Sequence, residues 1–101
     1  MSTQVLVQYP AGEAFDLDYY LKTHMPLVEK TWKPFGLASW EILSFPADAP
    51  YQIQARLTWE SADAWKAAAS HVDAKTVFDD IPNFTKAKAV LLAGQVAGAS
   101  S

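Results

Sequence analysis

The residues best suited to chemistry lie in one short run, Asp18-Tyr-Tyr-Leu-Lys-Thr-His-Met-Pro26. In a helix Tyr20 and His24 are one turn apart on the same face, so a phenol and an imidazole can reach the same bound molecule. An imidazole can give or accept a proton near neutral pH. The spacing therefore predicts a general acid/base, His24, with Tyr20 orienting or polarising an oxygen of the substrate.

His24 also has a purely structural interpretation. It shares its helix face with Leu17 and Leu21, so the ring points toward the interior, where a lone histidine often simply donates to a backbone carbonyl. Two local features favour a functional role. Pro26 cannot donate a backbone hydrogen bond and can open space at this end of the helix. The helix C-terminus favours the charged imidazole, whereas burial favours the neutral one. The two effects oppose each other, so the pKa of His24 can stay near neutral pH, where the ring can give or take a proton.

Other catalytic arrangements find less support in the sequence. The chain has no cysteine, and its second histidine, His71, stands at no metal-ligand spacing from His24, so neither a metal site nor a cofactor is expected. His71 is expected at the surface or a pocket rim. The adjacent carboxylates Asp79 and Asp80 are interpreted first as a solvated turn and second as a pocket lip. The aromatic residues Tyr19, Trp40 and Phe84 are the predicted substrate contacts.

The hydrophobic pattern predicts the elements that must position these residues. Alternation favours strands over 4–9, 37–45 and 51–59, and a last strand that includes Val90, Leu92 and Val96. A helix is expected after a cap at Asp16 or Asp18, with helical turns resuming over 27–32. A second, alanine-rich helix is expected from an N-cap at Ser61 to about residue 77.

The order strand, helix, strand, strand, helix, strand predicts an α+β, ferredoxin-like βαββαβ fold. In it a four-stranded antiparallel sheet carries both helices on one face. The domain is expected over residues 1–97, with a flexible tail at 98–101. The other sheet face is expected to be mixed in polarity, because it would carry glutamines, Arg56 and Thr58. Such a face suits either solvent or a second subunit.

Composition limits the partners of the chain. Its 101 residues are half hydrophobic, with a formal net charge of −3 and a pI near 5.1. These values argue against nucleic acid as a principal partner. The lysines are scattered and the N-terminus lacks a long apolar stretch, so no membrane association is expected and a cytoplasmic location is the default.

The run FDLDYYLKTHMPLVEKTW, followed by FGL and later by DIPNFT, resembles the EthD family, which is named for a component of an ether-degradation gene cluster. The likeness covers nearly the whole chain and places Tyr19, Tyr20, His24 and Pro26 in the family pattern. The sequence departs from it at Lys86-Ala-Lys-Ala89, where a proline is expected. The resemblance implies a dimeric α+β barrel, in which two ferredoxin-like domains join sheet to sheet as a homodimer. Relatives in this group include cofactor-free monooxygenases, isomerases and cyclases, and several carry a histidine on the first helix that faces the ligand cavity.

Three functions remain open from the sequence. The first is a cofactor-independent enzyme of oxidoreductase, isomerase or cyclase type that acts on a small hydrophobic or aromatic carbonyl compound, with His24 as acid/base. The second is a non-catalytic carrier that holds a small hydrophobic ligand for a partner oxygenase. The third is a haem-binding barrel with His24 as the axial ligand, which ranks last because Arg56 is the only arginine available for the haem propionates.

Overall fold

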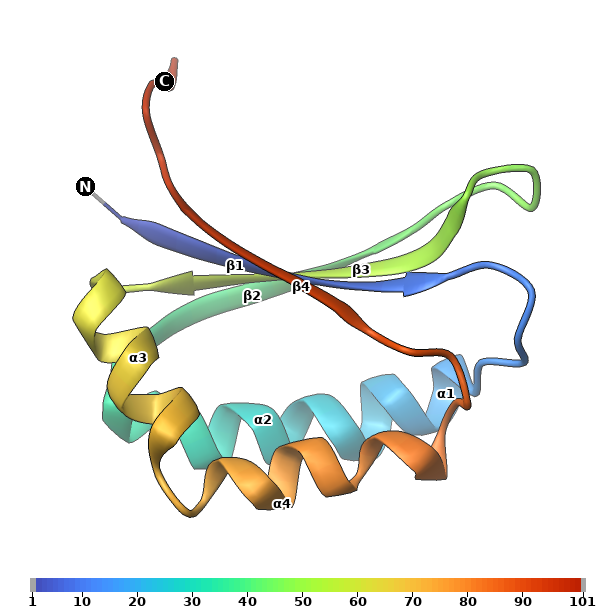
Figure 1. Ribbon diagram of the computed structural model, residues 1–101, viewed down its shortest axis with the longest axis horizontal. Helices are drawn as coiled ribbons and strands as arrows, with labels where there is room; N and C mark the ends of the chain where they lie inside the picture. Colours follow the sequence, from blue (N-terminus) through green and yellow to red (C-terminus); the bar gives the residue numbers. More distant parts are fainter. Residues whose placement is uncertain (1, 101) are drawn as a thin grey trace.

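A computed structural model describes residues 2–100. Met1 and Ser101, the outermost residues of the predicted domain and tail, lie outside the described residues. The remaining residues form one four-stranded antiparallel sheet with helices on a single face (Figure 1). The strands are β1 (Thr3–Pro10), β2 (Leu37–Ser44), β3 (Tyr51–Trp59) and β4 (Val90–Gln95), in the spatial order β2-β3-β1-β4. The predicted α+β, ferredoxin-like fold is therefore confirmed.

The first helical segment of the chain is continuous but not uniform. It consists of α1 (Leu17–Tyr19), a π-helical turn η1 (Tyr20–His24), α2 (Met25–Trp32) and a 3₁₀ turn η2 (Lys33–Phe35). Asp16 caps it by accepting the backbone N–H of Tyr19 at 3.0 Å. The wide turn comes directly before Pro26, and the Met25 N–H donates to the carbonyl of Tyr20. Pro26 thus disturbs the helix as expected, and the disturbed turn is the one that carries His24. Single π turns of this kind recur at functional sites.

The second helical segment differs from its prediction. One alanine-rich helix was expected from Ser61, but the chain forms α3 (Ala62–Ser70), α4 (Ala74–Asp79) and a 3₁₀ turn η3 (Ile81–Asn83). The Ser61 cap is confirmed, since its Oγ accepts from the Ala64 N–H at 3.1 Å. The helix ends at Ser70 because the backbone of His71 is extended, with φ −73° and ψ 148°, and side-chain hydrogen bonds to backbone groups lie on both sides of the break. The Ser70 Oγ donates to the Lys66 carbonyl at 2.7 Å, and His71 accepts the N–H of Asp73 at 3.1 Å.

This break directs α4 along α2, and Figure 1 shows the two helices side by side beneath the sheet. As a result, the end of α4 and the turn η3 reach the level of η1. Residues 79–84, which follow α4 in the sequence, are thereby brought next to Tyr19, Tyr20 and His24. The helix break therefore determines which side chains meet His24.

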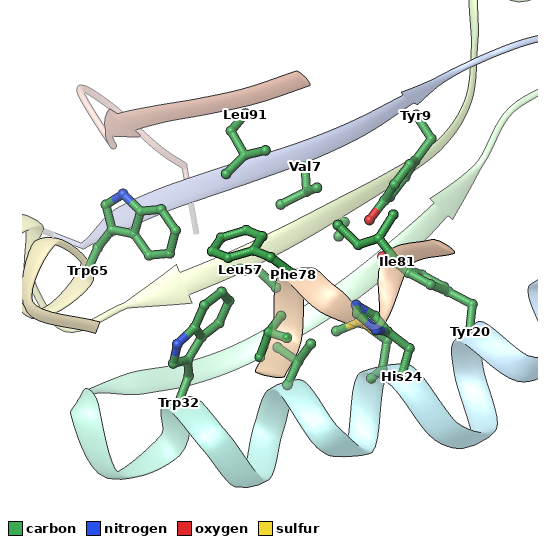
Figure 2. A pocket seen from close by; sticks show the side chains of 14 residues that line it. Val7, Tyr9, Tyr20, His24, Trp32, Leu57, Trp65, Phe78, Ile81 and Leu91 are labelled. Atoms are coloured by element: carbon green, nitrogen blue, oxygen red, sulfur yellow. The ribbon is translucent and has the colours of Figure 1, made fainter. Parts of the chain in front are cut away.

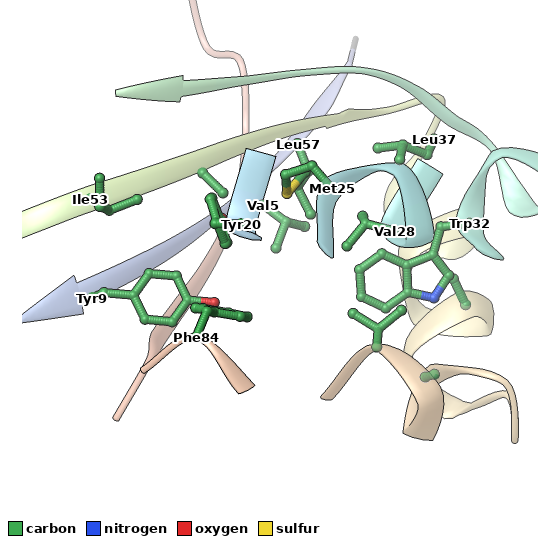
Figure 3. Packing of buried hydrophobic residues seen from close by; sticks show 14 of the residues in the cluster. Val5, Tyr9, Tyr20, Met25, Val28, Trp32, Leu37, Ile53, Leu57 and Phe84 are labelled. Carbon is green, nitrogen blue, oxygen red and sulfur yellow. The ribbon is translucent and has the colours of Figure 1, made fainter. Parts of the chain in front are cut away.

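The hydrophobic core lies between the sheet and the helices (Figure 3). Alternate residues of β1 and β3 point into it, among them Val5, Tyr9, Leu57 and Trp59, and the helices contribute Met25, Val28 and Trp32. Gly36, whose φ is +115°, ends the first helical segment in the left-handed region. A Cβ there would lie only 3.0 Å from that of Ala64.

The opposite face of the sheet carries no helix and is mixed in polarity, as predicted. Polar contacts cross it from strand to strand: Gln54 donates to Gln8 at 2.6 Å, and Arg56 pairs with Glu41 at 3.2 Å. Leu6 on β1 lies in register with Leu92 on β4, so the face also holds an apolar strip. After β4, residues 96–100 form no regular element.

Candidate functional site

His24 borders a cavity between the sheet and the helices. The volume open to the centre of a water-sized sphere is about 20 Å³, roughly the room needed by one water molecule. Its walls are apolar except at one end, where His24, Tyr9 and Tyr20 meet (Figure 2). Among the described residues, no Lys, Arg, Asp or Glu lines it. The lining therefore favours an uncharged, apolar group with a polar atom at the histidine end, and any guest larger than a water molecule requires the cavity walls to move apart.

The imidazole of His24 is held at one nitrogen by a distant carboxylate. Its Nδ1 lies 2.8 Å from Oδ2 of Asp80, across 56 residues of sequence. The His24 side chain is only 4% exposed and that of Asp80 12%. In the part of the chain that the structure describes, Nε2 has no hydrogen-bond partner.

Asp80 is itself held by two further donors. The Tyr19 hydroxyl donates to its Oδ1 at 2.7 Å, and the Asn83 side-chain amide donates to the same oxygen at 2.8 Å. Burial alone would raise the pKa of Asp80, but the hydrogen bonds from Tyr19, Asn83 and His24 outweigh it and lower that pKa. The carboxylate is therefore ionised at neutral pH.

Burial lowers the pKa of His24, although the hydrogen bond and the charge of Asp80 act against it. The imidazole is thus neutral at pH 7 and able to accept a proton. Burial likewise raises the pKa values of Tyr9 and Tyr20, and an interaction between the two hydroxyls raises that of Tyr20 further, so both phenols stay protonated. This end of the cavity therefore places one base beside two protonated phenols.

The aromatic packing around His24 fixes the orientation of its ring. Tyr20 stacks on it with ring centroids 5.3 Å apart and planes inclined by 16°, and Phe84 packs against it at 4.6 Å. Phe84 in turn contacts Tyr9 and Tyr20 edge-on, at 5.7 and 4.9 Å. Such edge and stacked contacts each add about 0.5–1.5 kcal/mol beyond simple burial.

The cavity opens between β4 and the segment from α4 to η3. Most of its buried lining residues come from β1, β3 and the first helical segment, with Val77 from α4. Apart from Val7 on β1, the more exposed ones gather on one side: Trp65, Phe78, Ile81 and Leu91. Figure 2 shows Leu91 on its strand above Phe78, with Trp65 and Ile81 to either side. Leu91 is 40% exposed although it points to the helix side of the sheet. These four residues form the mouth of the cavity.

The predicted site residues are not all brought together. His24 and Tyr20 line the cavity. Phe84 packs behind them, Tyr19 contacts Asp80, and neither lines the cavity. Trp40 lies at the sheet edge, where its indole N–H donates to Glu29 at 3.3 Å. His71 is exposed, as expected.

Sequence reasoning missed three residues of this site. Tyr9 was not among the predicted site residues, yet it lines the cavity. Asp80 was interpreted first as part of a solvated turn, and that interpretation is wrong because Asp80 pairs with His24. Asn83 was quoted only within the family motif. No local spacing links Asp80 to His24, but the DIPNFT run, which begins at Asp80, was the available signal.

The described residues contain neither a metal-binding cluster nor a membrane-spanning helix. No three His, Cys, Asp or Glu side chains lie close enough together there to hold a metal ion. None of the helices within residues 2–100 has the length and apolar character needed to cross a membrane.

Comparison with known proteins agrees with the fold. No family model and no curated protein matches the chain. Among solved structures, the chain is similar to a dimeric ferredoxin-like protein of unknown function from Jannaschia sp. CCS1, with 14% identity, a TM-score of 0.68 and coverage of 95% of this chain and 100% of that one. The fold thus belongs to the ferredoxin-like class known from dimeric proteins.

The EthD resemblance is also confirmed. An EthD-like protein from Ralstonia eutropha JMP134 superposes with a TM-score of 0.84 at 26% identity, over 99% of this chain and 96% of that chain. An ethyl tert-butyl ether degradation (EthD) family protein from Bacillus halodurans C-125 follows at a TM-score of 0.70 and 16% identity, over 94% and 98%. The chain is thus similar to EthD-like proteins over nearly its whole length.

Proposed function

We propose that this EthD-like chain is a cofactor-independent enzyme that acts on a small, uncharged hydrophobic or aromatic carbonyl compound. The observation that carries the proposal is the neutral imidazole of His24, held at Nδ1 by Asp80 and bordering an apolar cavity beside Tyr20. His24 would remove a proton next to the carbonyl, and Tyr20 would donate a hydrogen bond to the oxygen on which negative charge develops. Cofactor-free oxidation, isomerisation and cyclisation can all begin with this step.

Two further facts support the proposal. The lining holds no charged side chain within the described residues other than the titratable His24, so a carboxylate substrate would lose its hydration without a partner. In addition, the fold is shared with SnoaB from Streptomyces nogalater, a cofactor-independent oxygenase, at a TM-score of 0.63 and 13% identity. The haem alternative fits less well, because no Lys or Arg lines the cavity within the described residues and Arg56, the only arginine in the sequence, pairs with Glu41 on the helix-free sheet face.

The test is turnover of neutral aromatic ketones, hydroxyketones and phenols by the parent protein and by His24→Ala. Loss of a general acid/base should lower turnover about 10²–10⁴-fold. His71→Ala, at the exposed histidine, should leave the rate unchanged. Because Trp32 and Trp65 line the cavity, quenching of tryptophan fluorescence reports binding in the same samples. Binding without turnover would establish the carrier function instead, and unchanged turnover in His24→Ala would remove His24 from the mechanism.

We further propose that the chain works as a homodimer in the cytoplasm, with the helix-free sheet face as the interface. Dimeric ferredoxin-like proteins of the same fold support this assembly. The apolar strip formed by Leu6 and Leu92, flanked by polar contacts, has the composition of a subunit interface. The mouth of the cavity lies on the helix side of β4, so such a dimer would leave it open.

A further inference from the structure

The carboxylate of Asp80 is surrounded by three hydrogen-bonding groups that divide between its two oxygens. Tyr19 and Asn83 both contact Oδ1, at 2.7 and 2.8 Å, whereas His24 Nδ1 contacts Oδ2 at 2.8 Å. Asp80 is not part of the cavity lining, so it contacts His24 from the side of the imidazole that faces away from the cavity. This arrangement fixes both the orientation and the hydrogen-bonding sense of the carboxylate.

An ionised carboxylate can only accept hydrogen bonds. The atom that faces Oδ2, Nδ1 of His24, must therefore carry a proton. In a neutral imidazole the other nitrogen, Nε2, is then an acceptor with a free lone pair. Nε2 lies on the side of the ring away from Asp80, and it has no protein partner in residues 2–100.

We propose that Asp80 is the positioning residue of this site. It fixes His24 in the Nδ1–H tautomer and so presents an unprotonated Nε2 to the cavity. The role of Nε2 as the base in turnover rests on the proposed function, but the tautomer itself does not.

Tyr19 and Asn83 determine how the amide would be oriented in the isosteric variant Asp80→Asn. Because both of them donate to the Oδ1 position, the amide oxygen of the new side chain must take that place. The amide nitrogen then occupies the Oδ2 position and donates to Nδ1 of His24. Nδ1 becomes an acceptor and the proton moves to Nε2. One substitution that preserves shape thus reverses the tautomer.

The experiment is ¹⁵N NMR of the histidine ring nitrogens in the full chain, recorded well above 6.5, the ordinary pKa of histidine. Protonated and unprotonated ring nitrogens resonate far apart, so each tautomer is read directly. A His71→Gln background leaves His24 as the only histidine. We expect the Nδ1–H form in the parent protein and the Nε2–H form in Asp80→Asn.

The matched control is Asp79→Asn, which alters the neighbouring carboxylate. Asp79 pairs with Lys75 at the surface, where both side chains are largely exposed. The Asp79→Asn substitution should therefore leave the tautomer of His24 unchanged. An Nε2–H form in the parent would overturn the proposal, and this measurement requires no variant to fold. An unchanged tautomer in folded Asp80→Asn would overturn it as well.

The result also separates this proposal from the proposed function. If the tautomer reverses in Asp80→Asn but no substrate is ever turned over, the positioning role stands and the enzymatic function fails. If a substrate is found, Asp80→Asn should lower kcat about 10²–10⁴-fold, as expected for loss of the base. KM should change little, because Asp80 does not line the cavity.

Discussion

At the scale of the residue, His24 shows how burial and a partner charge can combine into a usable base. Burial removes the imidazolium form at neutral pH, while Asp80 keeps the ring from becoming too weak a base. Neither effect alone would give an oriented base. The ring of a fully exposed histidine is free to rotate, and a buried histidine without a partner has no fixed tautomer. The stacked ring of Tyr20 then limits rotation.

The lowered pKa of His24 predicts how stability depends on pH. The unfolded chain takes up a proton on this residue as the pH falls through about 6.5, whereas the folded protein resists it. The unfolded state then binds more protons, so the free energy of unfolding should fall as the pH drops below 6.5. The slope can reach at most about 1.4 kcal/mol per pH unit for one group.

Urea denaturation at a series of pH values checks this prediction. In His24→Gln the free energy of unfolding should depend less on pH between 6.5 and the lower pH range in which the carboxylates titrate. His71→Gln should keep the slope of the parent. A parent whose stability is flat across this range would show that His24 is not held neutral. Below 3.8 the lowered pKa of Asp80 adds a second loss of stability in the same direction.

Only part of this residue pattern was predictable from the sequence. Tyr20 and His24 are four residues apart, so helical periodicity alone placed them on one face. Asp80 is 56 residues from His24, and no local rule connects two positions that meet only after the sheet and both helical segments have packed. Tyr9 lines the cavity rather than only filling the core, because the space opposite it is left unfilled, and a strand pattern carries no information on such gaps.

At the scale of the element, two irregularities build the site. The π turn η1 carries both Tyr20 and His24, and the break between α3 and α4 brings Asp80 to them. Pro26 predicted a disturbance of the first helix, but not its π-helical form nor that α2 would begin at Met25. The break between α3 and α4 was not foreseen, because a high alanine content favours one long helix. Side-chain hydrogen bonds of Ser70 and His71 to backbone groups accompany the break, and propensity does not describe them.

The gap between β4 and α4 predicts where ligands enter. Leu91→Trp should fill the mouth beside Phe78 and Ile81 and weaken binding of a neutral aromatic ligand about tenfold or more, equivalent to about 1.4 kcal/mol. The measurement is a fluorescence titration, corrected for the added indole. Leu92→Trp, the next residue on the same strand, points to the other sheet face and should leave affinity unchanged. Equal effects of both substitutions would place the entrance elsewhere.

At the scale of the whole molecule, the two sheet faces have different roles. The helix side holds the core, the cavity and its mouth. The bare side holds polar contacts between neighbouring strands and the pair Leu6 and Leu92. The ferredoxin-like architecture and the contrast between the two faces were foreseen, since alternation over β1 and β3 separates mostly apolar from mostly polar residues. What occupies the bare face in solution was left open by the sequence, because its mixed polarity suits water and a subunit alike.

Sheet-to-sheet dimerisation predicts that charge on the bare face disrupts assembly. Leu92→Arg would bring a buried, unpaired cation into the interface, together with its two-fold mate, so the dimer should dissociate. Light scattering of the parent should give about twice the 11.1 kDa monomer mass, and Leu92→Arg should approach the monomer value. Val72→Arg, at a turn residue that is 75% exposed, should leave the mass unchanged.

A monomeric parent at micromolar concentration would contradict the dimer. The cavity with His24 and Asp80 lies within one chain and would persist in a monomer. The tautomer experiment would therefore remain valid.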